Sequence, residues 1–147
     1  MSTNSRMTVA IHVLSYMIAA QRKRPDPVTS DQIASSVSTN PVVIRRMLGL
    51  LRRAGLVASR RGANAGWTLA KRADAITLLN VYEAVEEGPL FELHASPPNP
   101  NCPIARGIKP TLHRVYGRLE TGLKRQLSRT TLAQVFTDTF PRGYPNP

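Results

Sequence analysis

The segment from residue 29 to residue 55 most constrains the fold, because it carries two helix-start signals separated by a short polar turn. Residues 29–32 (TSDQ) have the spacing of a capping box, in which side chains three residues apart satisfy each other's backbone donors. Residues 38–41 (STNP) place capping residues before a proline that the first helical turn tolerates. We therefore expect a helix, a tight turn and a second helix that ends at Gly55.

The residues after Gly55 predict a β-hairpin. Residues 56–61 and 67–70 are strand-like, and residues 62–66 (GANAG) supply Gly and Asn, which tolerate a positive φ in a turn. A hairpin that directly follows the second helix of such a pair is typical of a winged helix-turn-helix, in which the hairpin is the wing.

The first helix is predicted over Met7–Ala20 and carries two apolar stripes. One stripe contains Met7, Ala10, Ile11, Leu14, Met17 and Ile18, and the other contains Val9, Val13, Tyr16 and Ala20. A helix that is apolar on two sides is either a fully buried central helix or a helix shared with a second subunit.

The C-terminal half predicts a helix over 78–87, an irregular proline-rich loop over 90–103, a long amphipathic helix that is kinked or begins at Pro110, and a short closing helix over 131–140. Apolar residues recur along the long helix to Leu127, more than a helix lying alone on a small domain needs. The fold class is mainly α with a small β-hairpin wing: a winged helix-turn-helix plus a long C-terminal dimerisation helix. We expect a DNA-binding domain over 1–88, a sensor-type loop over 89–103, and the dimerisation helix and C-terminal segment over 104–147.

The charge of the chain narrows the class of partner. Twenty Lys and Arg against nine Asp and Glu give a formal net charge of +11, which favours a polyanion, either nucleic acid or an anionic membrane surface. No apolar run is long enough to predict a transmembrane helix, and the N-terminal pattern disfavours export, so we expect a cytoplasmic protein. The five acids between residues 73 and 92 are interpreted as a solvated helix face.

Several segments together resemble one family. Residues 52–57 (RRAGLV), the Arg61-Gly62 pair and Gly66 followed by an aromatic residue resemble the RR-x-GLV…RG…GG-Y signature of the bacterial Rrf-two family of transcription regulators, the type that includes IscR, NsrR and CymR. Residues 76–85 resemble the next helix of that family, and the resemblance covers about residues 5–140. It implies a dimeric winged-helix regulator, in many cases a repressor, that senses redox state, nitric oxide, iron–sulfur status or a small molecule.

Two departures from the family pattern matter. Members that hold an iron–sulfur cluster carry three cysteines in the loop after the fourth helix, whereas this chain has only Cys102 there. A [2Fe–2S] centre is not expected on that pattern, so the chain resembles a cluster-lacking member with no cofactor. The wing turn also carries Asn64 and Ala65 where the family has a run of glycines.

The candidate DNA-binding residues lie on the second helix of the pair, the turn before it and the wing. Arg45 and Arg46 lie in the first turns of the helix, where an arginine fork reaches base edges in the major groove. Arg52 and Arg53 are candidate phosphate contacts, and Arg60 and Arg61 flank the wing turn, where Arg61 is placed at the minor groove. The full set is Ser38, Thr39, Asn40, Val42, Arg45, Arg46, Arg52, Arg53, Arg60 and Arg61. The first three would contact phosphate from the helix N-terminus.

The sensor candidates are Cys102 and His94. Cys102 precedes a predicted helix start, where the helix dipole and nearby basic side chains would favour a thiolate. Such a thiolate would suit a redox switch. The alternative is a structural or incidental cysteine. A metal site that also uses His113 has no recognisable spacing, so no metal is expected. No catalytic motif is present, and we expect no enzyme. The chain is predicted to bind double-stranded DNA as a homodimer, with a redox or small-molecule effector; the alternative is a nonspecific winged-helix nucleic-acid-binding structural protein.

Overall fold

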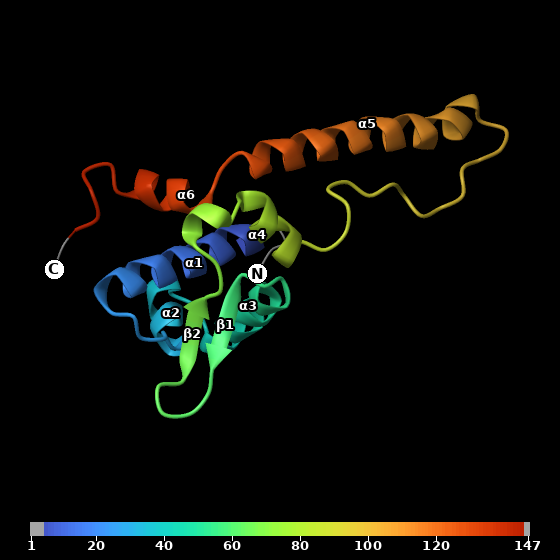
Figure 1. Ribbon diagram of the computed structural model, residues 1–147. Coiled ribbons are helices and arrows are strands. Elements are labelled where there is room, and N and C mark those ends of the chain that lie inside the picture. The colour runs from blue at the N-terminus through green and yellow to red at the C-terminus, as the bar shows by residue number, and fades with distance from the viewer. Residues whose placement is uncertain (1–4, 146–147) are drawn as a thin grey trace. The chain divides into compact units, whose positions relative to one another are not determined.

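Six α-helices and a two-stranded hairpin are found in the computed structural model, which describes residues 5–145 (Figure 1). The helices are α1 (Arg6–Lys23), α2 (Ser30–Val37), α3 (Pro41–Arg53), α4 (Leu78–Val85), α5 (Pro103–Ser128) and α6 (Leu132–Thr139). The strands are β1 (Val57–Arg60) and β2 (Gly66–Leu69), and a short 3₁₀ helix, η2, covers Ala73–Ala75. The predicted fold class, mainly α with a hairpin wing and a long C-terminal helix, is confirmed.

The chain forms two compact units. Unit 1 contains residues 5–86 and 127–145, and unit 2 contains residues 87–126. The predicted segment 104–147 is thus divided between them, because α6 belongs to unit 1 whereas most of α5 belongs to unit 2. The outermost residues of the predicted segments, 1–4 and 146–147, lie outside the described residues.

Side-chain caps fix where the helices begin. Thr29 and Gln32 form the predicted capping box: the Gln32 backbone N–H donates to the Thr29 hydroxyl at 3.2 Å, and the Thr29 N–H donates to the Gln32 side-chain oxygen at 2.9 Å. The helix α3 begins as predicted, with the Asn40 side-chain oxygen accepting from the Val42 N–H at 2.8 Å. Between them Ser38 adopts a left-handed conformation (φ 59°), which reverses the chain in a tight turn.

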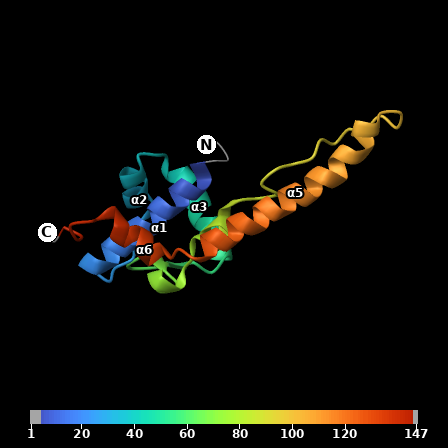
Figure 2. The same ribbon diagram turned by 90° about the horizontal axis from the view of Figure 1, so that it is seen from above.

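The helix α1 lies at the centre of unit 1, where it contacts α2, α3, α4, α6 and β2 (Figures 1 and 2). Residues of both predicted stripes enter the core: Leu14 and Met17 from the first and Val13 from the second are fully buried. Val9, Tyr16 and Ala20 are half-buried and pack against the same core. The second stripe is therefore largely covered within the chain, as the central-helix alternative requires. The other alternative, a helix shared with a second subunit, stays a prediction, because Val9, Tyr16 and Ala20 keep part of their surface exposed.

The hairpin is attached to the loop between α1 and α2. Within the hairpin β1 and β2 are antiparallel, with Val57 opposite Leu69 and Arg60 opposite Gly66. On its other edge β2 pairs with Val28: the Val28 N–H donates to the Trp67 carbonyl at 3.0 Å, and the Trp67 N–H donates to the Val28 carbonyl at 2.8 Å. This bridge holds the wing to the helical core through backbone groups alone.

The helix α4 ends at Val85, two residues earlier than predicted, because Glu86 is already extended (ψ 132°). Glu86, Glu87 and Glu92 consequently follow the helix, and Asp74 lies in η2. The interpretation of the five acids as a solvated helix face was therefore wrong for all but Glu83.

Unit 2 consists of an irregular segment and most of α5. The helix begins at Pro103 and continues through Pro110 rather than starting there. None of its described residues is fully buried, and Ile104, Ile108 and Leu119 are exposed. A contact that closes the irregular segment onto the helix is made by the Lys109 ammonium, which donates to the Ser96 carbonyl at 2.9 Å.

Gly66 is predicted to be intolerant of a side chain. A Cβ there would meet the Val28 carbonyl oxygen at 2.8 Å and the Pro27 Cβ at 2.9 Å, and the φ of 154° is one that L side chains rarely adopt. Gly66→Ala should lower the free energy of unfolding by about 1–3 kcal/mol, because the bridge between Val28 and Trp67 must shift. Urea denaturation would measure the change.

The matched control is Gly49→Ala, because nothing lies within 4 Å of a Cβ placed there in α3. This variant should be neutral or more stable by about 0.5–1 kcal/mol, since alanine replaces glycine inside a helix. Equal effects of the two substitutions would contradict the close approach at Gly66.

Candidate nucleic-acid interface

The helix α3 divides into a buried face and a basic face. Ile44, Met47, Leu48 and Leu51 are buried in the core of unit 1, and their spacing of three and four residues fixes the rotation of the helix. On the other face Arg45, Arg46, Arg52 and Arg53 are exposed. Val42 is also exposed, at 45% of its surface, although it is a β-branched apolar residue. The basic face is thus held outward by the packing of the opposite face.

The N-terminal end of α3 is polar. Asn40 is exposed and caps the helix, so its side-chain oxygen is occupied while its amide nitrogen still has donors to offer. Ser38 is exposed, whereas Thr39 is half-buried and its N–H donates to the Ala34 carbonyl at 3.0 Å. Unpaired backbone donors of a helix N-terminus attract anions, and this end of α3 has no acidic residue in its first turn.

Arg52 links α3 to the hairpin. Its guanidinium donates to the Ser59 hydroxyl at 3.4 Å, and its Cζ atom lies 6.0 Å from the centroid of the Trp67 ring. Both partners belong to the wing strands, so Arg52 bridges the helix and the wing as well as facing solvent. The sequence indicated an outward arginine here but gave no signal for these contacts.

The wing turn presents two arginines at its base. Arg60 and Arg61 are exposed, and the turn between the strands contains positive φ at Gly62 (91°) and Asn64 (109°), as the Gly and Asn pattern predicted. The Asn64 amide also donates to the Asp26 carboxylate at 3.4 Å. Asn64 therefore connects the wing tip to the loop after α1, a contact that sequence reasoning missed because 38 residues separate the two.

The arginines of this surface keep their charge available. Within residues 5–145, Arg45, Arg46, Arg53, Arg60 and Arg61 make no ion pair with an acid. Arg72, by contrast, donates to both carboxylate oxygens of Asp74, at 3.1 and 2.8 Å, and this contact lowers the pKa of Asp74. We name the exposed set on α3 and the wing (Arg45, Arg46, Arg52, Arg53, Arg60 and Arg61) the basic surface.

The sensor candidates lie in unit 2. Cys102 directly precedes α5, as predicted; it is a free, half-buried cysteine whose N–H donates to the Asn99 carbonyl at 3.1 Å. His94 is exposed in the irregular segment and makes no hydrogen bond with Cys102 in the described chain. His113 lies on α5 and lines a pocket with Phe91 and Tyr116. Across residues 5–145, no three His, Cys, Asp or Glu side chains are arranged to hold a metal ion.

A helix-turn-helix followed by a two-stranded wing, with arginines on the outward face of the second helix, defines a winged-helix DNA-binding regulator. The profile of the Rrf2 family, described as iron-dependent transcriptional regulator, matches residues 3–138. The chain belongs to the Rrf2 family, a family of transcription regulators and not of enzymes. The resemblance seen in the sequence is thereby confirmed.

Individual relatives agree with the family. The chain is 39% identical to the Bacillus subtilis protein YwnA, whose name assigns it to the HTH-type transcriptional regulators, over 93% of this chain and 98% of YwnA. It is similar to a solved crystal structure of a protein assigned as DNA-binding (35% identity, TM-score 0.71, 89% of this chain and 98% of that one). Its fold is also that of T. potens IscR (20% identity, TM-score 0.68, 97% of this chain and 91% of IscR).

The donor set of this chain does not fit the iron–sulfur cluster that other members of the family hold. Protein ligands to such clusters are mostly cysteine thiolates, four for a [2Fe–2S] centre in the common case. The whole chain contains one cysteine, Cys102, and among residues 5–145 no group of three His, Cys, Asp or Glu side chains could hold a metal ion.

The purified protein is therefore expected to be colourless and free of iron, even when it is prepared without oxygen. Visible absorption spectra and iron and sulfide determination would test this. A brown protein with stoichiometric iron and sulfide would contradict the argument from the donor set, and Cys102→Ala would then show whether the single thiol is a ligand.

Proposed function

We propose that the chain is a sequence-specific DNA-binding regulator, a repressor, that binds a palindromic operator as a homodimer. The observation that carries the proposal is the basic surface: six exposed arginines on α3 and the wing, attached to a rigid core. In winged-helix proteins the second helix of the pair enters the major groove with its N-terminal residues at the base edges. Arg45 and Arg46 lie in the first two turns of α3 and are exposed, which supports this role for them.

The remaining candidates have supporting roles in the proposal. Arg52 and Arg53 lie in the last turn of α3, where the DNA backbone is in reach and the bases are not. Ser38, Thr39 and Asn40 would donate to a phosphate at the N-terminal end of the helix. Val42 is the exposed apolar residue of the first turn and fits contact with a thymine methyl group. Arg60 and Arg61 would reach the adjacent minor groove.

The homodimer is supported by α5. This helix has no buried residue in the single chain, and Ile104, Ile108 and Leu119 are exposed at 75%, 37% and 49% of their surfaces. Amphipathic helices that lack a covered apolar side are commonly completed by a partner helix. A two-fold dimer would present two copies of α3 to a palindrome, so the operator symmetry follows from the proposed assembly.

We expect sedimentation at low micromolar concentration to give a species of about twice 16.2 kDa. Leu119→Glu should shift this species to the monomer, because a charge would have to be buried in the apolar contact. Val42→Glu is the control, since Val42 is equally apolar and exposed but lies on α3. A wild-type monomer would contradict the dimer and the palindrome together.

Alanine variants of Arg45 and Arg53 distinguish contacts to bases from contacts to phosphates. A bidentate arginine–guanine contact contributes about 1–3 kcal/mol of discrimination per base. Arg45→Ala should therefore weaken binding to the operator far more than binding to random DNA. Arg53→Ala should weaken both and reduce the salt slope by about one ion per site. The measurement is a salt titration of both variants on operator and scrambled duplexes.

The alternative, a nonspecific nucleic-acid-binding protein, gives a different result. It predicts equal losses on operator and scrambled duplexes for Arg45→Ala, and it predicts that excess competitor DNA removes the wild-type protein from every genomic fragment. Retention of particular fragments under competition would favour the regulator.

The loop around Cys102 is proposed to respond to redox state or to a small molecule. The thiol precedes α5, where the helix dipole favours an anion, and Arg106 lies one turn into the helix. Oxidant treatment should change operator binding of the wild type and leave that of Cys102→Ser unchanged if the thiol is the sensor.

A further inference from the structure

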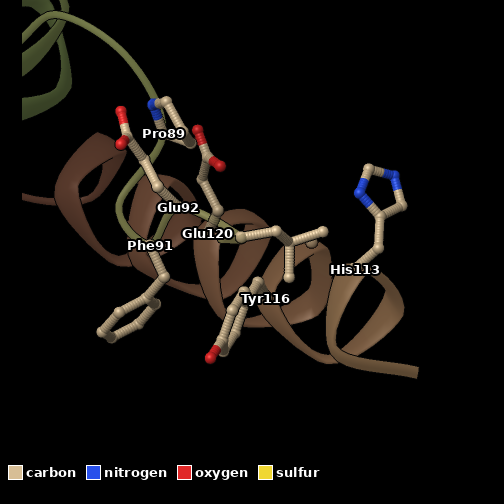
Figure 3. Close-up of a pocket in the computed structure, with 8 residues that line it drawn as sticks. Pro89, Phe91, Glu92, His113, Tyr116 and Glu120 are labelled. Atoms are coloured by element: carbon tan, nitrogen blue, oxygen red, sulfur yellow. The ribbon is translucent and has the colours of Figure 1, made fainter. Parts of the chain in front are cut away.

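A pocket of about 390 Å³ lies wholly within unit 2, between the irregular segment after α4 and one side of α5 (Figure 3). Its lining residues are Pro89, Phe91, Glu92, Leu93, His113, Tyr116, Gly117 and Glu120. A volume of this size is within the range of small-molecule sites, which begin at about 300 Å³. DNA binding uses none of these residues in the function proposed above.

One part of the pocket is aromatic. The rings of Phe91 and Tyr116 lie side by side, with centroids 5.0 Å apart and planes tilted by 34°. Phe91 is 48% exposed, which is unusual for a phenylalanine that already has an aromatic partner. Leu93 adds apolar surface to the lining. This part suits the apolar body of a ligand.

The other part is acidic. Glu92 and Glu120 extend in the same direction beside Pro89, on the opposite side of the view from the two rings (Figure 3). The lining contains no Lys or Arg. Elsewhere α5 is strongly basic, with six Lys and Arg between residues 103 and 128, and Glu120 is its only acid. Glu120, the single acid of α5, therefore lines the same pocket as Glu92 of the irregular segment.

Glu120 already pairs with an ammonium group of the chain itself. The Lys124 ammonium lies 3.3 Å from a carboxylate oxygen of Glu120, and the pair is partly exposed. An exposed pair of this kind contributes only a few tenths of a kcal/mol, so another ammonium ion can replace it.

We propose that this pocket binds a small organic ammonium ion with an apolar or aromatic body. The ammonium head lies between Glu92 and Glu120, and the apolar body lies against Phe91, Leu93 and Tyr116. Anionic ligands are disfavoured by the two carboxylates, and a metal ion lacks a third ligand among the described residues. The use of this ligand as an effector rests on the regulator function proposed above, whereas its binding does not.

In the test, the full-length protein is titrated calorimetrically with three probes of equal size. No DNA is present. Phenethylamine carries the ammonium group, phenethyl alcohol is its neutral counterpart, and phenylacetate is an anion of similar shape. We expect phenethylamine to bind at least about tenfold more tightly than the other two, because only it pairs with both carboxylates. Equal binding of the amine and the alcohol, or binding of neither, would overturn the proposal. Because no DNA is present, this result is independent of whether the chain recognises an operator.

Variants locate the site. Glu92→Gln and Glu120→Gln should each weaken phenethylamine binding by about three- to tenfold, since a neutral hydrogen bond replaces a charge-assisted one. Lys124→Gln should strengthen it about twofold by releasing Glu120. Glu87→Gln is the matched control, because it removes the same charge from the same segment outside the lining. Equal weakening by Glu87→Gln and Glu92→Gln would show only a general attraction and would overturn the assignment.

The competing occupant is a Lys or Arg side chain from a second copy of the chain. In that case Glu92→Gln and Glu120→Gln would dissociate the dimer in sedimentation, and the wild-type dimer would not bind phenethylamine. The proposal requires the opposite: both variants keep the assembly of the wild type and lose affinity for the amine.

Discussion

The burial of one face of α3 is the interaction on which the basic surface depends. Ile44, Leu48 and Leu51 are fully buried, so the helix cannot rotate about its axis without exposing them. Fully burying such a side chain is worth about 1.5–3 kcal/mol relative to leaving it in water. The arginines at the alternate positions are long and flexible, but their Cα atoms are held by this packing. The exposed arginines of the outer face are therefore oriented by apolar contacts on the inner face.

The wing is held to that frame by different forces. Its strands are four residues each, and a two-stranded hairpin of that size is only marginally stable alone. The two hydrogen bonds between Val28 and Trp67 extend β2 by one further backbone pairing, and Arg52 contacts the same strands from α3. The loop after α1, the helix α3 and the wing thus share contacts with Trp67 and its neighbours. A displacement of the Val28 loop would move the wing arginines relative to Arg45, and it would disturb the core as well, because Val28 is one of the buried core residues.

Local patterns allowed the helical framework to be predicted, because each signal acts over three or four residues. The capping residues Thr29 and Asn40 and the apolar spacing of α3 all specify their own turn of helix, and the structure follows them closely. Pro110 shows the limit: its ring predicts a break, but α5 continues through it, since propensity is only one contribution to the stability of a long helix. The end of α4 was placed two residues too late because Glu86 is an ordinary helix former in sequence.

The contacts that join distant segments had no such signal. Asn64 reaches Asp26, Arg52 reaches Ser59 across the end of its helix, and Thr131 pairs with Thr77 in an isolated bridge. Each depends on the packed arrangement of whole elements and not on the identity of neighbours in sequence. The residues of the candidate interface were identified because arginine on an outward helical face is itself the signal. The pocket of unit 2 was not identified, because Glu92 in sequence is one acid among five.

The net charge of the chain limits where an organic cation could bind to it. A chain with a net charge of +11 repels organic cations on average, so an amine can concentrate only where carboxylates are unshielded by bases. The pocket lining contains Glu92 and Glu120 and no Lys or Arg, and the one base that reaches it, Lys124, pairs with Glu120 in a partly exposed contact. A single cysteine does not supply the thiolates that an iron–sulfur cluster needs. Two carboxylates and an aromatic pair, by contrast, can distinguish an organic cation from a neutral or anionic ligand without redox chemistry. Unit 2 has room for such a site because its long helix is not committed to packing the core. No residue of α5 in this chain contributes to the buried core.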